Sequence, residues 1–119
     1  MSKSSQRTAY GETLVELGKE NKDVVVLEAD LGKSTMSYMF QETYPERYFE
    51  MGIAEQNMLS TAAGLAAGGQ IPFASTFAVF PAGRAYDQTR QTICHTRLNV
   101  HHYGSSCGCL LYTSAAADE

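Results

Sequence analysis

The sequence predicts an α/β fold in which a mostly parallel sheet lies between two helical layers, a three-layer αβα arrangement. Strand-like runs alternate with helical segments along the chain, as in folds built around a parallel sheet. The strand-like runs are apolar at consecutive positions, which is typical of strands covered on both faces. The chain has 119 residues, of which 44% are hydrophobic and 18% charged. These values indicate one globular domain.

The first half of the chain alternates helix and strand twice. Apolar residues at helical spacing predict a helix from Thr8 to about Asn21. The β-branched run Val24–Leu27 predicts a buried strand, and a polar loop over residues 28–34 follows it. A short helix is expected over residues 36–44, and a second strand over Tyr48–Met51.

The second half repeats the alternation. Small apolar residues predict a helix from Ala54 to about Gly68, followed by a strand over Ile71–Ser75. A longer helix is expected from about Ala82 to Thr96, and a fourth strand over Leu98–Tyr103. No internal repeat or linker interrupts the pattern, so residues 1–108 read as one domain. Ligands of such sheets bind beyond the carboxyl ends of the strands.

Composition argues against several classes of partner. The formal charge is −4 and the sequence has no basic cluster, so we expect neither nucleic acid nor a membrane as a partner. No apolar run reaches transmembrane length and no signal-peptide core follows the first residues, which favours a cytoplasmic protein. The cysteines are odd in number and their spacing to the histidines fits no zinc pattern, so we expect free thiols and no metal site.

Glu55 is the most informative single residue. It lies at the mouth of an apolar helix, directly after a predicted strand, and Ile53, Met58 and Leu59 are expected to keep it poorly hydrated. The field of the helix N-terminus and this apolar setting act on its proton in opposite directions. Such a carboxyl suits proton transfer, but glutamate in a first helical turn also serves simply to complement the helix dipole.

Residues 109–119 have no place in the alternating pattern. This tail closely resembles the translated read-through of a transposase sequencing adapter. We therefore expect the biological part of this sequence to stop near Gly108, with the domain incomplete at its carboxyl-terminal end, and we interpret residues 109–119 as non-native.

Six blocks, in order from about Arg7 to Gly108, resemble the pyrimidine-binding domain of transketolase. They are Arg7–Gly11, Ala29–Ser34, Gly52–Met58, Ala62–Ala66, Ser75–Phe80 and Arg84–Arg90. The chain is similar to the start of the separate carboxyl-terminal subunit of a split transketolase. The resemblance implies the pyrimidine-domain type of thiamine diphosphate-binding fold.

The resemblance also implies roles for four residues at a thiamine diphosphate site shared between chains. Glu55 matches the catalytic glutamate that hydrogen-bonds a ring nitrogen of the aminopyrimidine. Phe77 and Phe80 match aromatics that pack against this ring, although their i, i+3 spacing also fits plain core packing. Asp30 matches a carboxylate near the thiazolium, and it also suits a turn after a strand.

Substrate handling is implied at two further positions. Arg7 and Ser34 match residues that hold the phosphate of a sugar phosphate; the alternatives are a solvated charge and a helix N-cap. Ser106 stands where the family usually carries a substrate-contacting histidine. Arg84, together with Asp87 and Gln88, is expected to pair at a chain interface.

Family members hold the diphosphate and its metal on a different domain, through a Gly-Asp-Gly motif that this sequence lacks. The resemblance therefore implies a diphosphate-binding partner subunit that holds Mg²⁺ or Ca²⁺, in a homo- or hetero-oligomer. The implied reaction is transfer of a two-carbon ketol unit between sugar phosphates, with the fragment alone inactive. Alternatives are a 1-deoxyxylulose-5-phosphate synthase, a 2-oxo acid dehydrogenase beta-type subunit, or a non-catalytic interaction fragment. The synthases typically have histidine where this chain has Asn57.

Overall fold

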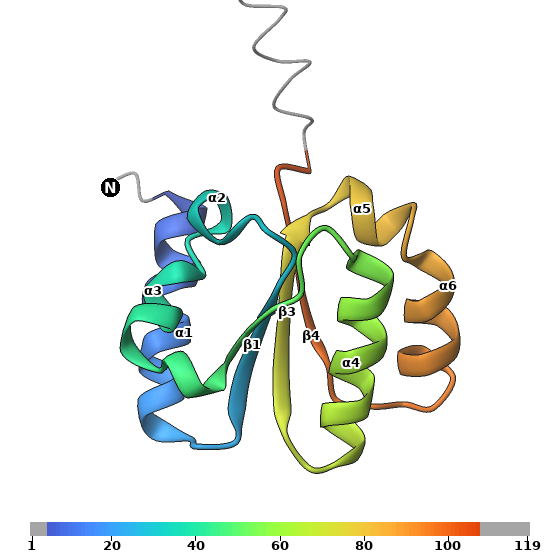
Figure 1. Cartoon of the computed structure of the whole chain (residues 1–119), viewed down its shortest axis with the longest axis horizontal. Coiled ribbons are helices and arrows are strands. Elements are labelled where there is room, and N and C mark those ends of the chain that lie inside the picture. Colours follow the sequence, from blue (N-terminus) through green and yellow to red (C-terminus); the bar gives the residue numbers. More distant parts are fainter. Residues whose placement is uncertain (1–4, 108–119) are drawn as a thin grey trace, which may run out of the picture.

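The computed structural model describes residues 5–107, which form a four-stranded parallel sheet between two layers of helices (Figure 1). The strands are β1 (Val24–Glu28), β2 (Tyr48–Glu50), β3 (Ile71–Phe77) and β4 (His101–Ser105). Their order across the sheet is β2-β1-β3-β4, and every pairing is parallel. The predicted three-layer αβα fold is confirmed.

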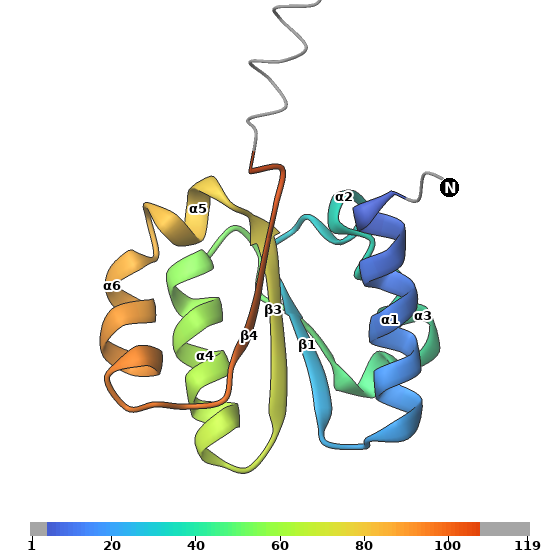
Figure 2. The same ribbon diagram turned by 180° about the vertical axis from the view of Figure 1, so that it is seen from behind.

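The helices divide between the two faces of the sheet, as both views show (Figures 1 and 2). One layer holds α1 (Gln6–Glu20), α2 (Gly32–Thr35), α3 (Tyr38–Thr43) and the 3-10 turn η1 (Pro45–Arg47). The other holds α4 (Glu55–Ala67), α5 (Val79–Ala82), α6 (Tyr86–Gln88) and the π-helical segment η2 (Thr89–Cys94). None of the helices in the described part of the chain is long and apolar enough to cross a membrane.

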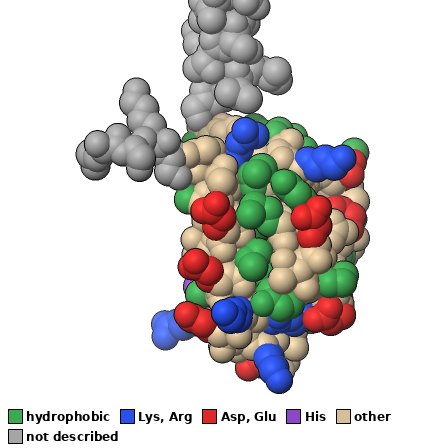
Figure 3. Space-filling model, turned by 90° about the vertical axis from the view of Figure 1, so that its left-hand side faces the viewer, with side chains coloured by type: hydrophobic (Ala, Val, Ile, Leu, Met, Phe, Trp, Pro, Cys, Tyr) green, Lys and Arg blue, Asp and Glu red, His purple; other side chains and the backbone are tan. Residues whose placement is uncertain are grey.

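The outer surface on the side of α1 and α3 carries charges of both signs. Figure 3 shows acidic and basic side chains on either side of a central strip of hydrophobic side chains. Mixed charge of this kind does not produce the single-sign field that steers polyelectrolytes to a surface.

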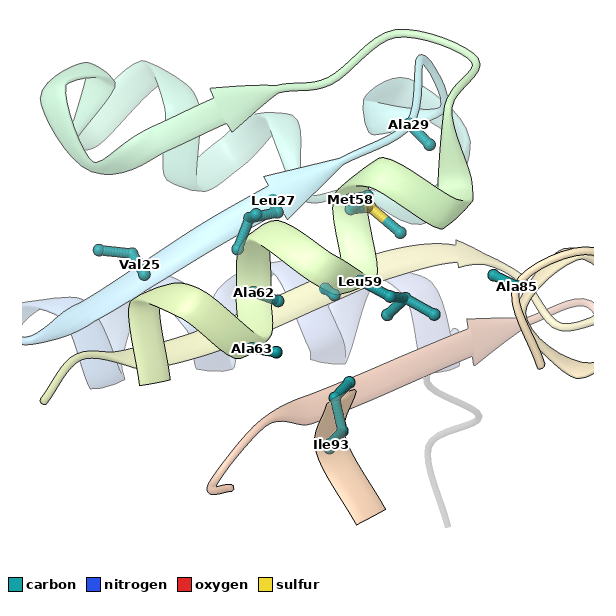
Figure 4. Close-up of a cluster of buried hydrophobic side chains, with 10 residues drawn as sticks. Val25, Leu27, Ala29, Met58, Leu59, Ala62, Ala63, Ala85 and Ile93 are labelled. Atoms are coloured by element: carbon teal, nitrogen blue, oxygen red, sulfur yellow. The ribbon is translucent and has the colours of Figure 1, made fainter. Parts of the chain in front are cut away.

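The core lies on both faces of β1, all five residues of which are buried. Val24 and Val26 belong to the cluster that packs against α1 and α3. Val25 and Leu27 belong to the cluster on the opposite face, under α4 (Figure 4). Because successive side chains of a strand point to opposite faces, burial on both faces explains the continuous apolar run.

The sheet changes its direction of growth between β1 and β3. The chain leaves β1 to form β2 on one side, then returns through α4 to form β3 on the other side. Connections therefore diverge at the carboxyl ends of β1 and β3, which is where ligands bind in open α/β sheets. Figure 1 shows α2, α5 and the first turns of α1 and α4 at this same edge.

The predicted continuous helix from Ala82 to Thr96 is wrong. The chain forms the short helix α5, a turn with a non-helical Gly83 (φ −103°, ψ −83°), then α6 and η2. Within η2 and the turn that follows it, the hydroxyls of Thr89, Thr92 and Thr96 each donate to the carbonyl four residues earlier. Threonine hydroxyls that bond back in this way bend helices.

Other boundaries differ by a few residues. The predicted polar loop over residues 28–34 contains the last residue of β1 and the first three residues of α2. The fourth strand begins at His101, because the Leu98 N–H donates to the Ile93 carbonyl and so closes η2. The predicted non-native tail, residues 109–119, lies outside the described residues.

Candidate functional site

Four of the predicted site residues belong to segments that lie at the carboxyl edge of the sheet, where Figure 1 shows the end of β3, α5 and the start of α4. Asp30 follows β1 and Glu55 begins α4. Phe77 ends β3, and Phe80 follows in α5. Residues far apart in the sequence therefore lie at the same edge because parallel strands end there together.

Glu55 is almost completely buried, with 2% of its surface exposed. Met58 and Leu59, one turn along α4, are fully buried, which agrees with an apolar setting for this helix start. Ile53 is 70% exposed, so the expectation that it also shields the carboxyl is wrong. Ala54 caps the helix without a side-chain hydrogen bond, and Glu55 is the acidic residue of the first turn.

One carboxylate oxygen of Glu55, Oε2, is buried and has no hydrogen-bond partner among the described residues. Arg84 Nη1 lies 3.5 Å from it, and this ion pair is loose because the arginine side chain is 55% exposed. A buried acceptor without a donor costs free energy, and a ligand N–H can relieve that cost. Arg84 thus forms an ion pair within the chain. Asp87 does so too, with Arg90 Nη2 at 2.7 Å. The predicted role of Arg84 and Asp87 at an interface between chains stays a prediction.

Two aromatic rings lie at the end of β3. The centroids of Phe77 and Phe80 are 6.3 Å apart and their planes are inclined by 18°. Phe77 is in a strand and Phe80 in a helix, so the i, i+3 helical spacing that suggested core packing does not apply. Both rings are only partly buried, and exposed aromatic faces suit contact with a flat heterocycle.

Asp30 lies in a left-handed turn, with a φ of 59°. Its N–H donates to Glu50 Oε1 at 2.7 Å, and the Gly52 N–H donates to the same oxygen at 2.9 Å. Gly52 also has a positive φ, of 68°. Glu50, which sequence reasoning missed, thus joins the loop after β1 to the loop before α4. The turn role and the site role of Asp30 are compatible, since aspartate tolerates this conformation.

The structure brings Arg7 and Ser34 together across 27 positions of sequence. Arg7 Nη1 donates to the Ser34 carbonyl at 3.3 Å, and the arginine side chain remains exposed. Ser34 lies inside α2, whose N-cap residue is Leu31, so the alternative that Ser34 caps a helix is wrong. A guanidinium and a hydroxyl on adjacent elements can both donate to a phosphate oxygen.

Sequence reasoning also missed Glu28, the last residue of β1, which is fully buried. Thr35 Oγ1 and Ser37 Oγ donate to its Oε2 at 2.7 and 2.6 Å, and the Ala29 N–H donates to its Oε1 at 3.1 Å. Burial raises the pKa of Glu28 to about 7, although these three donors act to lower it. A carboxylate that ends a buried strand, followed by hydroxyls seven and nine residues later, was the available signal.

A cavity of about 380 Å³ lies beside this network. Its lining joins the loop after β1 to α2, α3 and the end of β2, and it includes Asp30, Ser34 and Glu50. Within residues 5–107, no group of three or more metal-ligating side chains converges.

Comparison with known proteins gives a consistent result. A family model described as "Transketolase, pyrimidine binding domain" matches residues 2–118. The "Putative transketolase C-terminal section" of Methanocaldococcus jannaschii is 52% identical over 94 residues, which are 79% of this chain and 30% of that protein. The "1-deoxy-D-xylulose-5-phosphate synthase" of Desulfotalea psychrophila is 40% identical over 97 residues, 82% of this chain and 15% of that protein.

A solved structure agrees with the relatives. It is entitled "Split gene transketolase, inactive beta4 tetramer", superimposes with a TM-score of 0.75 and is 58% identical, covering 82% of this chain and 33% of that one. The chain thus spans about a third or less of the length of these proteins. This chain belongs to the transketolase family, with residues 2–118 matching the pyrimidine-binding domain.

Proposed function

We propose that this chain supplies the aminopyrimidine side of a thiamine diphosphate site in a transketolase, which transfers a two-carbon ketol unit between sugar phosphates. The observation that carries the proposal is the buried Glu55 Oε2, which has no hydrogen-bond partner among the described residues. A buried carboxylate oxygen that accepts no hydrogen bond suits a nitrogen heterocycle that donates or exchanges a proton there.

The residues present fit the cofactor, and each has a definable task. Glu55 Oε2 would hold or release a proton at a ring nitrogen of the aminopyrimidine. Phe77 and Phe80 would pack against the flat ring and keep water from the proton. Asp30 would place negative charge beside the cationic thiazolium. Thiamine diphosphate, when bound, supplies the electron sink for breaking and making a carbon–carbon bond.

Arg7 and Ser34 would bind the phosphate of the sugar substrate. The hydrogen bond from the Arg7 guanidinium to the Ser34 carbonyl brings a permanent positive charge to the residue that carries the hydroxyl. Arginine suits this task because its planar guanidinium donates two hydrogen bonds to one phosphate.

A diphosphate-binding partner subunit completes the proposed site. This sequence lacks the Gly-Asp-Gly motif with which family members hold the diphosphate. The partner would therefore hold the diphosphate and its Mg²⁺ or Ca²⁺, and the active species would be an oligomer of the two chains in the cytoplasm.

The test is reconstitution of the 119-residue chain with a diphosphate-binding transketolase subunit. We expect cofactor-dependent two-carbon transfer from a ketose phosphate in the mixture and none from either chain alone. Glu55→Gln should abolish the transfer, whereas Glu12→Gln, the same chemical change at an exposed position of α1, should leave it intact. A mixture that binds thiamine diphosphate but transfers nothing contradicts the enzymatic proposal and favours a non-catalytic interaction fragment.

A 1-deoxyxylulose-5-phosphate synthase is the second candidate, because the Desulfotalea psychrophila relative has that name. We place it second because Asn57 stands where those synthases typically have histidine. Supplying the same mixture with pyruvate and an aldose phosphate distinguishes the two, since only the synthase releases carbon dioxide from pyruvate.

A further inference from the structure

Glu28 is a buried titratable group that the proposed function does not use. Both of its side-chain donors come from the connection between α2 and α3: Thr35 ends α2, and Ser37 lies two residues further on. Between them the backbone turns sharply at Met36, whose φ is 70°. Two short hydrogen bonds from one turn to one carboxyl group fix that turn against the end of β1.

Three titratable groups face Glu28 from the neighbouring elements. Glu50 lies at the end of β2, Tyr48 on β2 and Tyr10 on α1. The negative charge of Glu50 adds to the rise in the pKa of Glu28. Burial raises the pKa of Tyr48 to about 12 and also raises that of Tyr10, so both stay neutral near pH 7. Proton exchange near neutral pH in this network therefore belongs to Glu28.

The network connects directly to the candidate phosphate site. The segment α2 that it fixes carries Ser34, whose carbonyl accepts a hydrogen bond from Arg7. A shift of α2 away from β1 would separate Ser34 from the sheet edge and remove the contact that holds the Arg7 guanidinium.

We propose that Glu28 is a positioning residue: its buried carboxyl group holds α2, and through it Ser34 and Arg7, at the edge of the sheet, and ionisation of this carboxyl group loosens α2. The role in phosphate binding rests on the proposed function, whereas the hold on α2 does not.

The direction follows from linkage. Burial outweighs the three donors, so the closed structure binds the proton of Glu28 more tightly than water-exposed glutamate does, with a pKa of about 7 against an ordinary 4.5. Opening of α2 that hydrates the carboxyl group therefore becomes more favourable as the pH rises towards and through 7. The opening constant can increase by at most about 300-fold, the ratio of the two proton affinities.

The test is amide hydrogen exchange by NMR on the full 119-residue chain between pH 5.5 and 8.5, corrected for the intrinsic pH dependence of exchange. The Thr35 N–H, which donates to the Leu31 carbonyl, reports on α2. We expect its opening constant to rise with an inflection near pH 7. Glu28→Gln should give a flat profile, whereas Glu42→Gln, the same change at an exposed position of α3, should keep the inflection. A Glu28→Gln profile with the wild-type inflection overturns the proposal.

Two further variants keep the carboxyl group and test the same point if Glu28→Gln does not fold. Thr35→Val and Ser37→Ala each remove one donor that lowers the pKa of Glu28. The inflection, read from the Ser34 amide, should therefore move to higher pH in both. A merely structural role of the two hydroxyls would change the amount of opening and leave the inflection where it is, and that result also overturns the proposal.

Sulfate, whose charge is constant over this pH range, serves as the probe for the phosphate site. We expect it to shift the Ser34 amide and the Arg7 guanidinium signals. Its affinity should fall from pH 6 to 8 in the wild type by the factor by which the closed fraction of α2 falls, taken from the exchange profiles, and should stay constant in Glu28→Gln. If sulfate moves neither signal at any pH, the phosphate role in the proposed function is wrong. The exchange profiles still decide the inference about α2.

Discussion

Arg47 holds the carboxyl end of α1 to the sheet, and its removal should destabilise the chain strongly. Its guanidinium donates to the carbonyls of Gly18 at 2.9 Å, Asn21 at 3.2 Å and Val24 at 3.3 Å. The side chain is only 15% exposed, so water replaces these donors poorly. The first two carbonyls end α1, where a helix has no partners of its own for its last carbonyls.

The expected cost of Arg47→Met can be estimated from these contacts. Methionine preserves the apolar stem and removes the donors. Hydrogen bonds to charged groups contribute roughly 1.5–3 kcal/mol each, and the carbonyls regain part of this from water. The guanidinium carbon also lies 4.1 Å from the centroid of the Tyr44 ring, a cation–π contact of about 0.5–1 kcal/mol. We expect the free energy of unfolding to fall by about 3 kcal/mol.

Equilibrium unfolding in urea, followed by circular dichroism, measures this loss. Arg90→Met is the matched control, because Arg90 is 53% exposed and its pair with Asp87 lies on the surface. The control should change the free energy of unfolding by less than about 0.5 kcal/mol. If Arg47→Met costs no more than the control, the assignment of Arg47 as the anchor of α1 is wrong.

Three other changes test separate parts of the structure. Gly32→Ala should lower the free energy of unfolding in urea by about 1–3 kcal/mol, because the new Cβ would lie 2.7 Å from Tyr48 Oη. Gly64→Ala, whose Cβ would have nothing within 4 Å, should instead raise the free energy of unfolding by about 0.5–1 kcal/mol through the better helix propensity of alanine in α4. Equal effects of the two variants would refute the contact with Tyr48. Between pH 4.5 and about 7 the folded chain keeps a proton on Glu28 that the unfolded chain has lost. As the pH rises through this range, the free energy of unfolding should therefore fall by about 3 kcal/mol more in the wild type than in Glu28→Gln. Parallel pH profiles of the two proteins in urea unfolding would contradict this. Glu55→Gln should change the free energy of unfolding by less than about 1 kcal/mol, because it keeps the shape of the side chain and removes an ion pair whose arginine partner is 55% exposed. A larger loss in urea unfolding would show that the pair with Arg84 fixes the start of α4.

The layers of the fold follow from the sequence because burial leaves a direct record in it. The run Val24–Leu27 is apolar at every position, and the structure places alternate residues in the two hydrophobic clusters. The helix over residues 82–96 was mispredicted because apolar spacing says nothing about Gly83 or about hydroxyls that bond back to the helix. Local backbone geometry of this kind depends on competing hydrogen bonds rather than on periodicity.

The candidate site was predictable where one residue type carries the chemistry. The motif placed Glu55 at the start of a helix, and the structure agrees that it is buried. Glu28 and Glu50 were missed because their importance arises from partners brought close by the fold: hydroxyls of the α2–α3 turn for one, and N–H groups of two separate loops for the other. The position of Glu28 at the end of an apolar strand was a signal within a short window, but no such pattern shows which donors the fold brings to either carboxylate.

The central claim concerns a single atom, Glu55 Oε2, and an experimental structure of this chain assembled with a diphosphate-binding subunit and thiamine diphosphate tests it most directly. We predict that Oε2 lies about 2.6–3.2 Å from a ring nitrogen of the aminopyrimidine. An assembly in which the Glu55 carboxyl group turns to solvent, or stays paired with Arg84 while the pyrimidine binds elsewhere, would contradict the account.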